Sequence, residues 1–369
     1  AMNRPDAYLL EFGYPTDPTK ADTDGDGFND SIESHYDSDP NNAAVTPNTI
    51  RPAGAVIAWG SNSNGQTTVP TSLNDVIQVG GGELYSSALR RTGEVVAWGH
   101  NGWQEINVPA RARSNVVEIS ASGSRGQTVL LGSGEVLFWG DSGYGQNNIP
   151  DEAKHGIVAV SAGSRHSMAL TAAGKVLVWG NNQYGQTSVP TEALSEIRAI
   201  SAGGYHSLAL TKGGRVIAWG DNSNGAANVP AECSSGIVAI AGGDQHSLAL
   251  TVGGKVLAWG NPLSGATTVP AAALSGVKQI SASGGSSYAL KEDGTIVAWG
   301  RGVEGQLSVP AAYQNSYLSV GAGFRHSLAI IPAASGTAPT ITSTNPLIGA
   351  VGVPLEYSVT ASGTAPITY

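Results

Sequence analysis

Residues 158–190 read VAVSAGSRHSMALTAAGKVLVWGNNQYGQTSVP, and this pattern recurs at intervals of about forty residues between residues 51 and 332. The clearest marker is an apolar run that ends in Trp-Gly, with its tryptophan at Trp59, Trp98, Trp139, Trp179, Trp219, Trp259 and Trp299. Successive tryptophans are 39 to 41 residues apart. A fixed period in this range is typical of repeat architectures, in which each repeat forms one supersecondary unit.

Each repeat consists of short apolar runs separated by Gly, Asn and Ser, which is the pattern of strands and turns. Runs such as residues 216–219 (VIAW) are apolar on both faces, so both faces are expected to be buried. The blades of a propeller meet that condition because each sheet lies between two others. The sequence therefore predicts an all-β fold, a seven-bladed β-propeller over residues 51–332.

The two ends of the repeat region complement each other. The region begins with a Trp-Gly strand at residues 55–60 and ends with HSLAI at residues 326–330, which has no Trp-Gly strand of its own. We therefore predict that residues 55–60 complete the last blade. Such closure removes the exposed strand edges through which sheets aggregate.

Composition limits the function. The net charge is −9, whereas a general nucleic-acid binder needs a basic surface that neutralises phosphates. The chain has no apolar run long enough to insert in a membrane, and Cys233 is its single cysteine, so a disulfide framework is excluded. The repeats contain no nucleophile elbow, phosphate-binding loop or metal triad. We expect a non-enzymatic protein that binds no nucleic acid and does not insert in a membrane.

The repeats resemble the RCC1 propeller family, and more closely its bacterial branch, typified by beta-lactamase inhibitory protein II. The shared sequence motifs are GKVLAWG at residues 254–260, GQTSVP at 185–190, SGIVAI at 235–240 and AGGDQHSLAL at 241–250. The resemblance covers every repeat. It implies a rigid ring whose aromatic and charged loop residues at one end cap a target enzyme.

Two loops vary between the copies: the one before each His-Ser strand and the one after each Trp-Gly. These loops carry fewer aromatic residues than the loops of the inhibitor. Aromatic and arginine side chains are the usual hot spots of protein interfaces, so those that are present here are the candidates. The candidate partner-binding residues are Trp103, Tyr144, Tyr184, Tyr205, Phe324, Arg125, Arg165 and Arg325. We expect an unidentified protein partner. The alternatives are an inhibitor of a secreted enzyme of the beta-lactamase type and a carbohydrate-active or lyase-type propeller enzyme.

Residues 22–33 (DTDGDGFNDSIE) match the twelve-residue calcium loop at each ligand position. The predicted ligands are the side chains of Asp22, Asp24, Asp26, Asp30 and Glu33 and the carbonyl of Phe28. Calcium is thus the expected cofactor. Pro15 and Pro18 exclude the entering helix of an EF-hand, and the surrounding residues 1–50 resemble a thrombospondin type 3 repeat.

Residues 333–369 differ again in composition. Apolar and polar residues alternate between residues 338 and 361, and this stretch resembles the start of a bacterial immunoglobulin-like domain. We therefore expect a monomeric propeller within a larger modular chain that is secreted or displayed at the cell surface. In this interpretation, residues 1–50 form a calcium-stiffened stalk that leads into the ring.

A histidine recurs at one position of the repeat, at His166, His206, His246 and His326. The other copies carry Tyr85, Gly126 and Ser286 there. A residue that recurs with the structural motif is expected to be structural, so we predict buried histidines that hydrogen-bond to the backbone.

Overall fold

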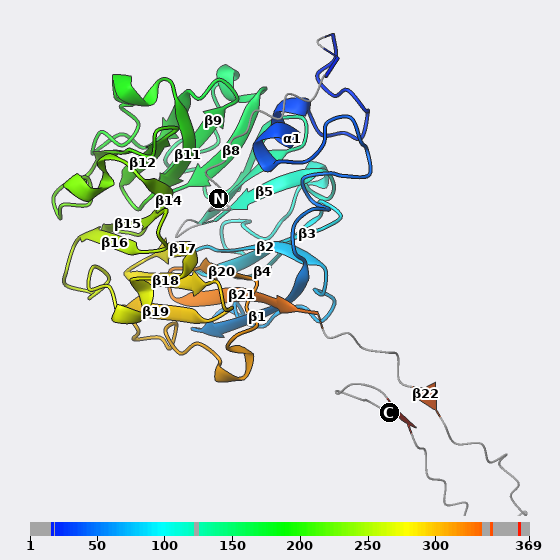
Figure 1. Cartoon of the computed structure of the whole chain (residues 1–369). Helices are drawn as coiled ribbons and strands as arrows, with labels where there is room; N and C mark the ends of the chain where they lie inside the picture. Colours follow the sequence, from blue (N-terminus) through cyan, green and yellow to red (C-terminus); the bar gives the residue numbers. More distant parts are fainter. Residues whose placement is uncertain (1–15, 18, 122–124, 334–339, 342–360, 363–369) are drawn as a thin grey trace, which may run out of the picture. The chain divides into compact units, whose positions relative to one another are not determined.

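The computed structural model describes residues 16–17, 19–121, 125–333, 340–341 and 361–362 (Figure 1). The chain divides into two units, residues 1–332 and residues 333–369. In the second unit the short strands β22 (Thr340–Ile341) and β23 (Ala361–Ser362) pair with each other. The rest of the predicted immunoglobulin-like stretch lies outside the described residues. No helix in the described part of the chain is long and apolar enough to span a membrane.

The first unit is built almost entirely from three-stranded antiparallel sheets, and the all-β prediction is confirmed. Five such sheets are found among the described residues: β5 (Val116–Ser120), β6 (Gly126–Leu131) and β7 (Val136–Gly140); β8 (Ile157–Ala162), β9 (His166–Thr171) and β10 (Val176–Gly180); β11 (Ile197–Ala202), β12 (His206–Thr211) and β13 (Val216–Gly220); β14 (Ile237–Gly242), β15 (His246–Thr251) and β16 (Val256–Gly260); and β17 (Val277–Ser283), β18 (Ser286–Lys291) and β19 (Ile296–Gly300).

A six-stranded sheet joins the first and last repeats. Its order is β20 (Ser319–Ala322), β21 (His326–Pro332), β1 (Gly54–Gly60), β2 (Val76–Gly81), β3 (Tyr85–Arg90) and β4 (Val95–Gly99). β1 pairs with β21 along its whole length, from Gly54 opposite Pro332 to Gly60 opposite His326. It pairs with β2 at a single position, so the sheet consists of two three-stranded groups. The two ends of the repeat region therefore meet in one sheet.

The tryptophans join each sheet to the sheet before it. Trp59 of β1 packs in a buried cluster with Tyr288 and Ile296 of the β17–β19 sheet. Its indole N–H donates a 2.7 Å hydrogen bond to the backbone carbonyl of Gln306, in the loop that follows that sheet. The other indoles donate in the same way over 2.8 to 2.9 Å: Trp98 to Gln66, Trp139 to Glu105, Trp179 to Gln146, Trp219 to Gln186, Trp259 to Ala226 and Trp299 to Ala266.

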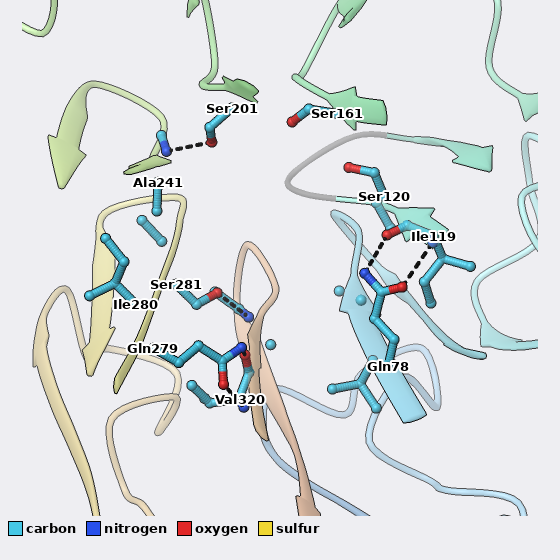
Figure 2. A pocket seen from close by; sticks show the side chains of 18 of the residues that line it. Gln78, Ile119, Ser120, Ser161, Ser201, Ala241, Gln279, Ile280, Ser281 and Val320 are labelled. Carbon is cyan, nitrogen blue, oxygen red and sulfur yellow. Dashed lines mark hydrogen bonds between the residues drawn. The ribbon is translucent and has the colours of Figure 1, made fainter. Parts of the chain in front are cut away.

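The first strand of each three-stranded group faces a central cavity of about 110 Å³ (Figure 2). Its lining is rich in Gly, Ala and Ser, because small side chains allow the strands to approach each other. The serine hydroxyls are used between neighbouring sheets: Ser161 Oγ accepts a hydrogen bond from the backbone N–H of Ala202, and Ser201 Oγ accepts one from Gly242. The cavity is therefore part of the scaffold.

Short 3-10 turns, which were not predicted from the sequence, follow the Val-Pro or Ile-Pro of the repeats. Each begins directly after a proline that fixes the backbone at its start. In the described residues they are η1 (Ala110–Ala112), η2 (Asp151–Ala153), η3 (Thr191–Ala193), η4 (Ala231–Ser234), η5 (Ala271–Ala273) and η6 (Ala311–Tyr313).

The described part of the N-terminal segment packs against the sheets, whereas a stalk was predicted. Its helix α1 (Asp30–Tyr36) lies beside β5 and β8 (Figure 1), and Phe28, Ile32 and Tyr36 are buried in a core cluster with residues of both sheets. The backbone N–H of Asn29 donates to the carbonyl of Gly132 at 2.8 Å, in the turn between β6 and β7. Three apolar side chains cannot stay in water without cost, and the ends of these sheets bury them.

Candidate functional site

Both variable loops of each repeat lie at the same end of the sheets. In the β8–β10 sheet, His166 pairs with Gly180, so the loop before β9 and the loop after β10 are adjacent. The backbone N–H of Asn181 donates to the carbonyl of Arg165 at 2.9 Å. The equivalent bond recurs in the other repeats. We call this end the loop face, made of residues 61–65, 82–84, 100–104, 125, 141–145, 163–165, 181–185, 203–205, 221–225, 243–245, 261–265, 283–285, 301–305 and 323–325.

The structure brings four of the predicted partner-binding residues into one group. The Arg165 guanidinium carbon lies 4.2 Å from the ring centroid of Tyr144 and 5.4 Å from that of Tyr205. Tyr205 in turn meets Tyr184 edge-on, with 5.3 Å between centroids. A cation held against aromatic faces is stabilised electrostatically, so the group is preorganised. Tyr144 and Tyr184 are exposed, at 40% and 46% of their full area.

Two further pairs complete the predicted set. Arg125 lies over the ring of Trp103, with 4.1 Å to the centroid, and its Nε donates to the Glu83 carboxylate at 2.5 Å. This ion pair raises the pKa of Arg125. Arg325 lies 5.9 Å from the ring centroid of Phe324. These pairs are separate contacts rather than one continuous aromatic cluster.

Two hollows on the loop face are lined by residues that were not among the predicted partner-binding residues. One, of about 230 Å³, is lined by Arg165, Tyr205 and Phe324 and also by Asp244. A second, of about 280 Å³, lies on the other side of Asp244 and Phe324. The face also carries Leu263 and Val303, which are 91% and 76% exposed. The available signal was an apolar residue at a loop position where the other copies carry Ser, Gly or Gln.

The predicted calcium loop gathers three of its ligands. Carboxylate oxygens of Asp22, Asp24 and Asp26 lie within 4.8 Å of one another. Asp30 lies outside this group, and its two oxygens accept 2.8 Å hydrogen bonds from the backbone N–H and hydroxyl of Thr23. Glu33 is also outside it: its side chain is fully buried and Oε1 accepts a bond from Ser38.

The donor set of this loop fits a divalent cation. Burial, and then the neighbouring Asp26 carboxylate, raise the pKa of Glu33 to about 8. Its Oε2 atom, together with Oδ2 of Asp24 and Oδ2 of Asp26, is buried without a hydrogen-bond partner in the described structure. Unpartnered carboxylate oxygens crowded in one loop are the arrangement that a hard cation with oxygen ligands stabilises. Phe28 lies within the loop, with its side chain buried against the sheets.

The recurrent histidines are structural, but they bond to side chains and not to the backbone as predicted. His166 Nε2 lies 3.0 Å from Ser207 Oγ of the next sheet. Ser207 donates its own proton to the Gln186 carbonyl, so Nε2 carries the proton donated to Ser207. The same contact joins His206 to Ser247, His246 to Ser287 and His326 to Ser86. Burial lowers the pKa of each of these histidines to about 4.

Comparison with known proteins identifies RCC1 repeats in part of the chain. Residues 157–186, 197–226, 237–266 and 277–306 match the model of the regulator of chromosome condensation (RCC1) repeat. No curated protein matches the chain.

Solved structures show the same fold. One similar structure is that of Prp20p from Saccharomyces cerevisiae, described with its binding to Gsp1p and histones, with a TM-score of 0.64, 19% identity and coverage of 76% of this chain and 91% of that one. Human WBSCR16 follows with a TM-score of 0.60, 17% identity and coverage of 77% and 100%. The ectodomain of the Physcomitrella patens receptor kinase CR4 has a TM-score of 0.52 and 22% identity, with 66% of each chain covered.

Proposed function

We propose that this chain is a non-enzymatic protein-interaction module, a closed seven-bladed RCC1-like ring that binds a protein partner through its loop face. The observation that carries the proposal is the group formed by Arg165, Tyr144, Tyr205 and Tyr184. Tyrosine and arginine dominate the hot spots of protein interfaces, because they combine a large contact area with directed hydrogen bonds. Their rigid mutual packing lowers the entropy lost on binding.

The hydrogen-bond donors of Arg165 favour a partner over an internal role. Among the described residues, no hydrogen bond or ion pair engages its guanidinium, whereas Arg125 and Arg325 have carboxylate neighbours in Glu83 and Glu304. The N–H donors of Arg165 are thus available while the tyrosine rings fix its position. A carbonyl or carboxylate of a partner protein matches these donors.

The structural relatives support this class of function. Yeast RCC1, Prp20, has been solved bound to Kap60, and Prp20p binds Gsp1p and histones. RCC1-like propellers of similar fold thus serve as protein-binding scaffolds. The net charge of −9 favours a partner other than nucleic acid.

Calcium completes the proposal at the opposite end of the sheets. Asp22, Asp24, Asp26, Asp30 and Glu33, with the Phe28 carbonyl, would hold the ion, which would neutralise the crowded carboxylates. Instead of stiffening a free stalk, it would fix a segment that is fastened to the ring. Modules that bind calcium at the high concentrations outside cells fit a secreted or cell-surface location.

Selection of a random peptide library against the immobilised protein tests the binding face. We expect enriched peptides whose affinity depends on Arg165 and Tyr205. It should not depend on residues in the hairpins at the opposite end of the sheets. Peptides that bind equally well to Arg165→Ala and Tyr205→Ala variants would contradict the proposal. Circular dichroism of each variant verifies that the fold is intact.

A further inference from the structure

We propose that the hollow beside Asp244 binds a basic side chain, lysine or arginine, of the partner protein. This inference rests on the proposed binding face and names the chemistry of one contact within it. Asp244 precedes β15 and lines hollows on two sides, one of about 280 Å³ and one of about 230 Å³. It lies where the loops of several repeats converge.

Glycines of the neighbouring repeats make room for this carboxylate. A side chain at Gly204 would place its Cβ 2.3 Å from Asp244 Oδ1, so only glycine allows the carboxylate to pack there. On the other side, the backbone N–H of Asp244 donates to the carbonyl of Gly284 at 2.8 Å. The hydrogen bond fixes the backbone of Asp244, and the space beside Gly204 lets its carboxylate lie against the protein surface.

The larger hollow exists because one repeat lacks its usual side chains. Gly285 occupies the position at which the other repeats carry Leu84, Arg125, Arg165, Tyr205, Gln245 and Arg325. The space is bordered by Asp244, Phe324, Leu263 and Arg301. Phe324 supplies an aromatic wall and Leu263 an apolar rim, which suit the methylene stem and the charged head of a long basic residue.

The carboxylate has no counter-charge of its own. Within the described residues, no lysine or arginine nitrogen lies within 4 Å of Asp244, and none of its oxygens accepts a hydrogen bond. Burial raises the pKa of its carboxyl, with no opposing contribution from a nearby cation. A partly desolvated carboxylate without a partner gains strongly when a cation arrives from a binding protein.

Capped amino acids test the site directly with the full chain. N-acetyl-lysine N-methylamide and its arginine counterpart would be titrated by NMR, with the norleucine analogue as the neutral control. We expect saturable shifts for at least one basic compound, weakened roughly tenfold in Asp244→Asn because the ion pair is lost. Asp221→Asn is the matched control, since Asp221 lies on the same face and accepts a hydrogen bond from the Ser223 N–H.

Three outcomes would overturn the inference: no saturable binding of either basic compound, equal binding of norleucine, or unchanged binding to Asp244→Asn. Failure here is distinguishable from failure of the proposed function. Peptides whose binding requires Arg165 but no basic residue of their own would support the loop face as the binding surface and refute the contact with Asp244. Binding of capped lysine, without any peptide that depends on Arg165, would support the Asp244 site and refute the proposed function of the loop face.

Discussion

The hydroxyl of Ser327 in β21 donates a 2.7 Å hydrogen bond to the hydroxyl of Tyr288 in β18, across the boundary between two sheets. Tyr288 thereby takes the place of the histidine that other repeats use, because Ser286 is too short to reach. Its own hydroxyl donates to the Gln306 carbonyl at 3.1 Å. One repeat has thus replaced its histidine with a tyrosine two residues further along the strand and kept the link between sheets.

This substitution predicts a compensating set of changes. In the histidine repeats, a side chain three residues earlier is excluded: a Cβ at Gly203 would lie 2.2 Å from the His206 ring. The Tyr288 repeat has Ser283 at that position. We expect Tyr288→Leu to lower the free energy of unfolding by about 2–4 kcal/mol, since it removes a buried hydroxyl network and leaves a cavity.

Adding Ser283→Gly and Ser286→His to Tyr288→Leu rebuilds the histidine arrangement and should recover much of that loss. Urea denaturation of the wild type, Tyr288→Leu and the triple variant measures the free energy of unfolding of each. The control is Ser286→His alone, which should not stabilise because Ser283 obstructs the ring. A triple variant that is no more stable than Tyr288→Leu would show that Tyr288 does not replace the histidine.

The buried histidines predict acid sensitivity. Their pKa is about 4 in the folded protein and about 6.5 in the unfolded chain, so the unfolded state binds more protons between these values. The free energy of unfolding should therefore fall as the pH decreases from 6.5 to 4 and should change little from these groups below that. The urea midpoint measured along this pH range is the readout.

A single histidine variant separates this cause from general acid effects. His246→Gln remains neutral, so it should reduce the pH dependence of the unfolding free energy by about one proton equivalent. His155→Gln is the matched control, because His155 is exposed and outside the sheet contacts. If both variants keep the slope of the wild-type protein, the histidines are not the groups responsible.

The proposed calcium loop predicts a cation-dependent melting temperature. We expect calcium to raise the melting temperature of the chain and chelator to reverse the effect, because the ion binds only the folded loop. Glu33→Gln should weaken calcium binding roughly tenfold or more, since it removes the charge of the last ligand. Calorimetric titration measures both. Asp39→Asn, outside the twelve-residue loop, should bind like the wild type; equal affinity in all three proteins would refute the predicted ligand set.

One hydrogen bond between the proposed calcium loop and the sheets can be removed at a single side chain. Asn115 Nδ2 donates to the Gly27 carbonyl at 2.9 Å, and Asn115 has a positive φ of 58°. Asn115→Gly keeps this backbone conformation and deletes only the side chain. We expect faster hydrogen exchange across residues 26–36 and 116–120 in this variant, with the other sheets unaffected. Unchanged exchange in both segments would show that the bond does not hold the segment.

Much of the fold follows from the sequence because each repeat carries its own strand signals. The Trp-Gly runs mark one strand, and their missing copy at the C-terminal end points to the pairing of residues 54–60 with β21. Contacts between repeats were harder to predict. The histidine partners, such as Ser207 for His166, come from the neighbouring sheet, and spacing along the chain does not specify that geometry.

The candidate sites show the same division. Arg165 and Tyr205 were predicted from residue type, and the structure adds that Arg165 packs on Tyr144 and Tyr205 on Tyr184. Asp244 was missed because its setting depends on glycines about forty residues away on either side, Gly204 and Gly284. The docking of residues 28–36 was missed because the calcium motif says nothing about the surface on which it packs.

The most direct test of the loop face is the dissociation constant of the strongest selected peptide for three proteins: the wild type, Arg165→Ala and Arg215→Ala. Arg215 is an exposed arginine in the hairpin at the opposite end of the sheets. The proposed function predicts roughly tenfold or greater weakening for Arg165→Ala and an unchanged constant for Arg215→Ala. An unchanged constant for Arg165→Ala, or a larger loss for Arg215→Ala, would contradict it.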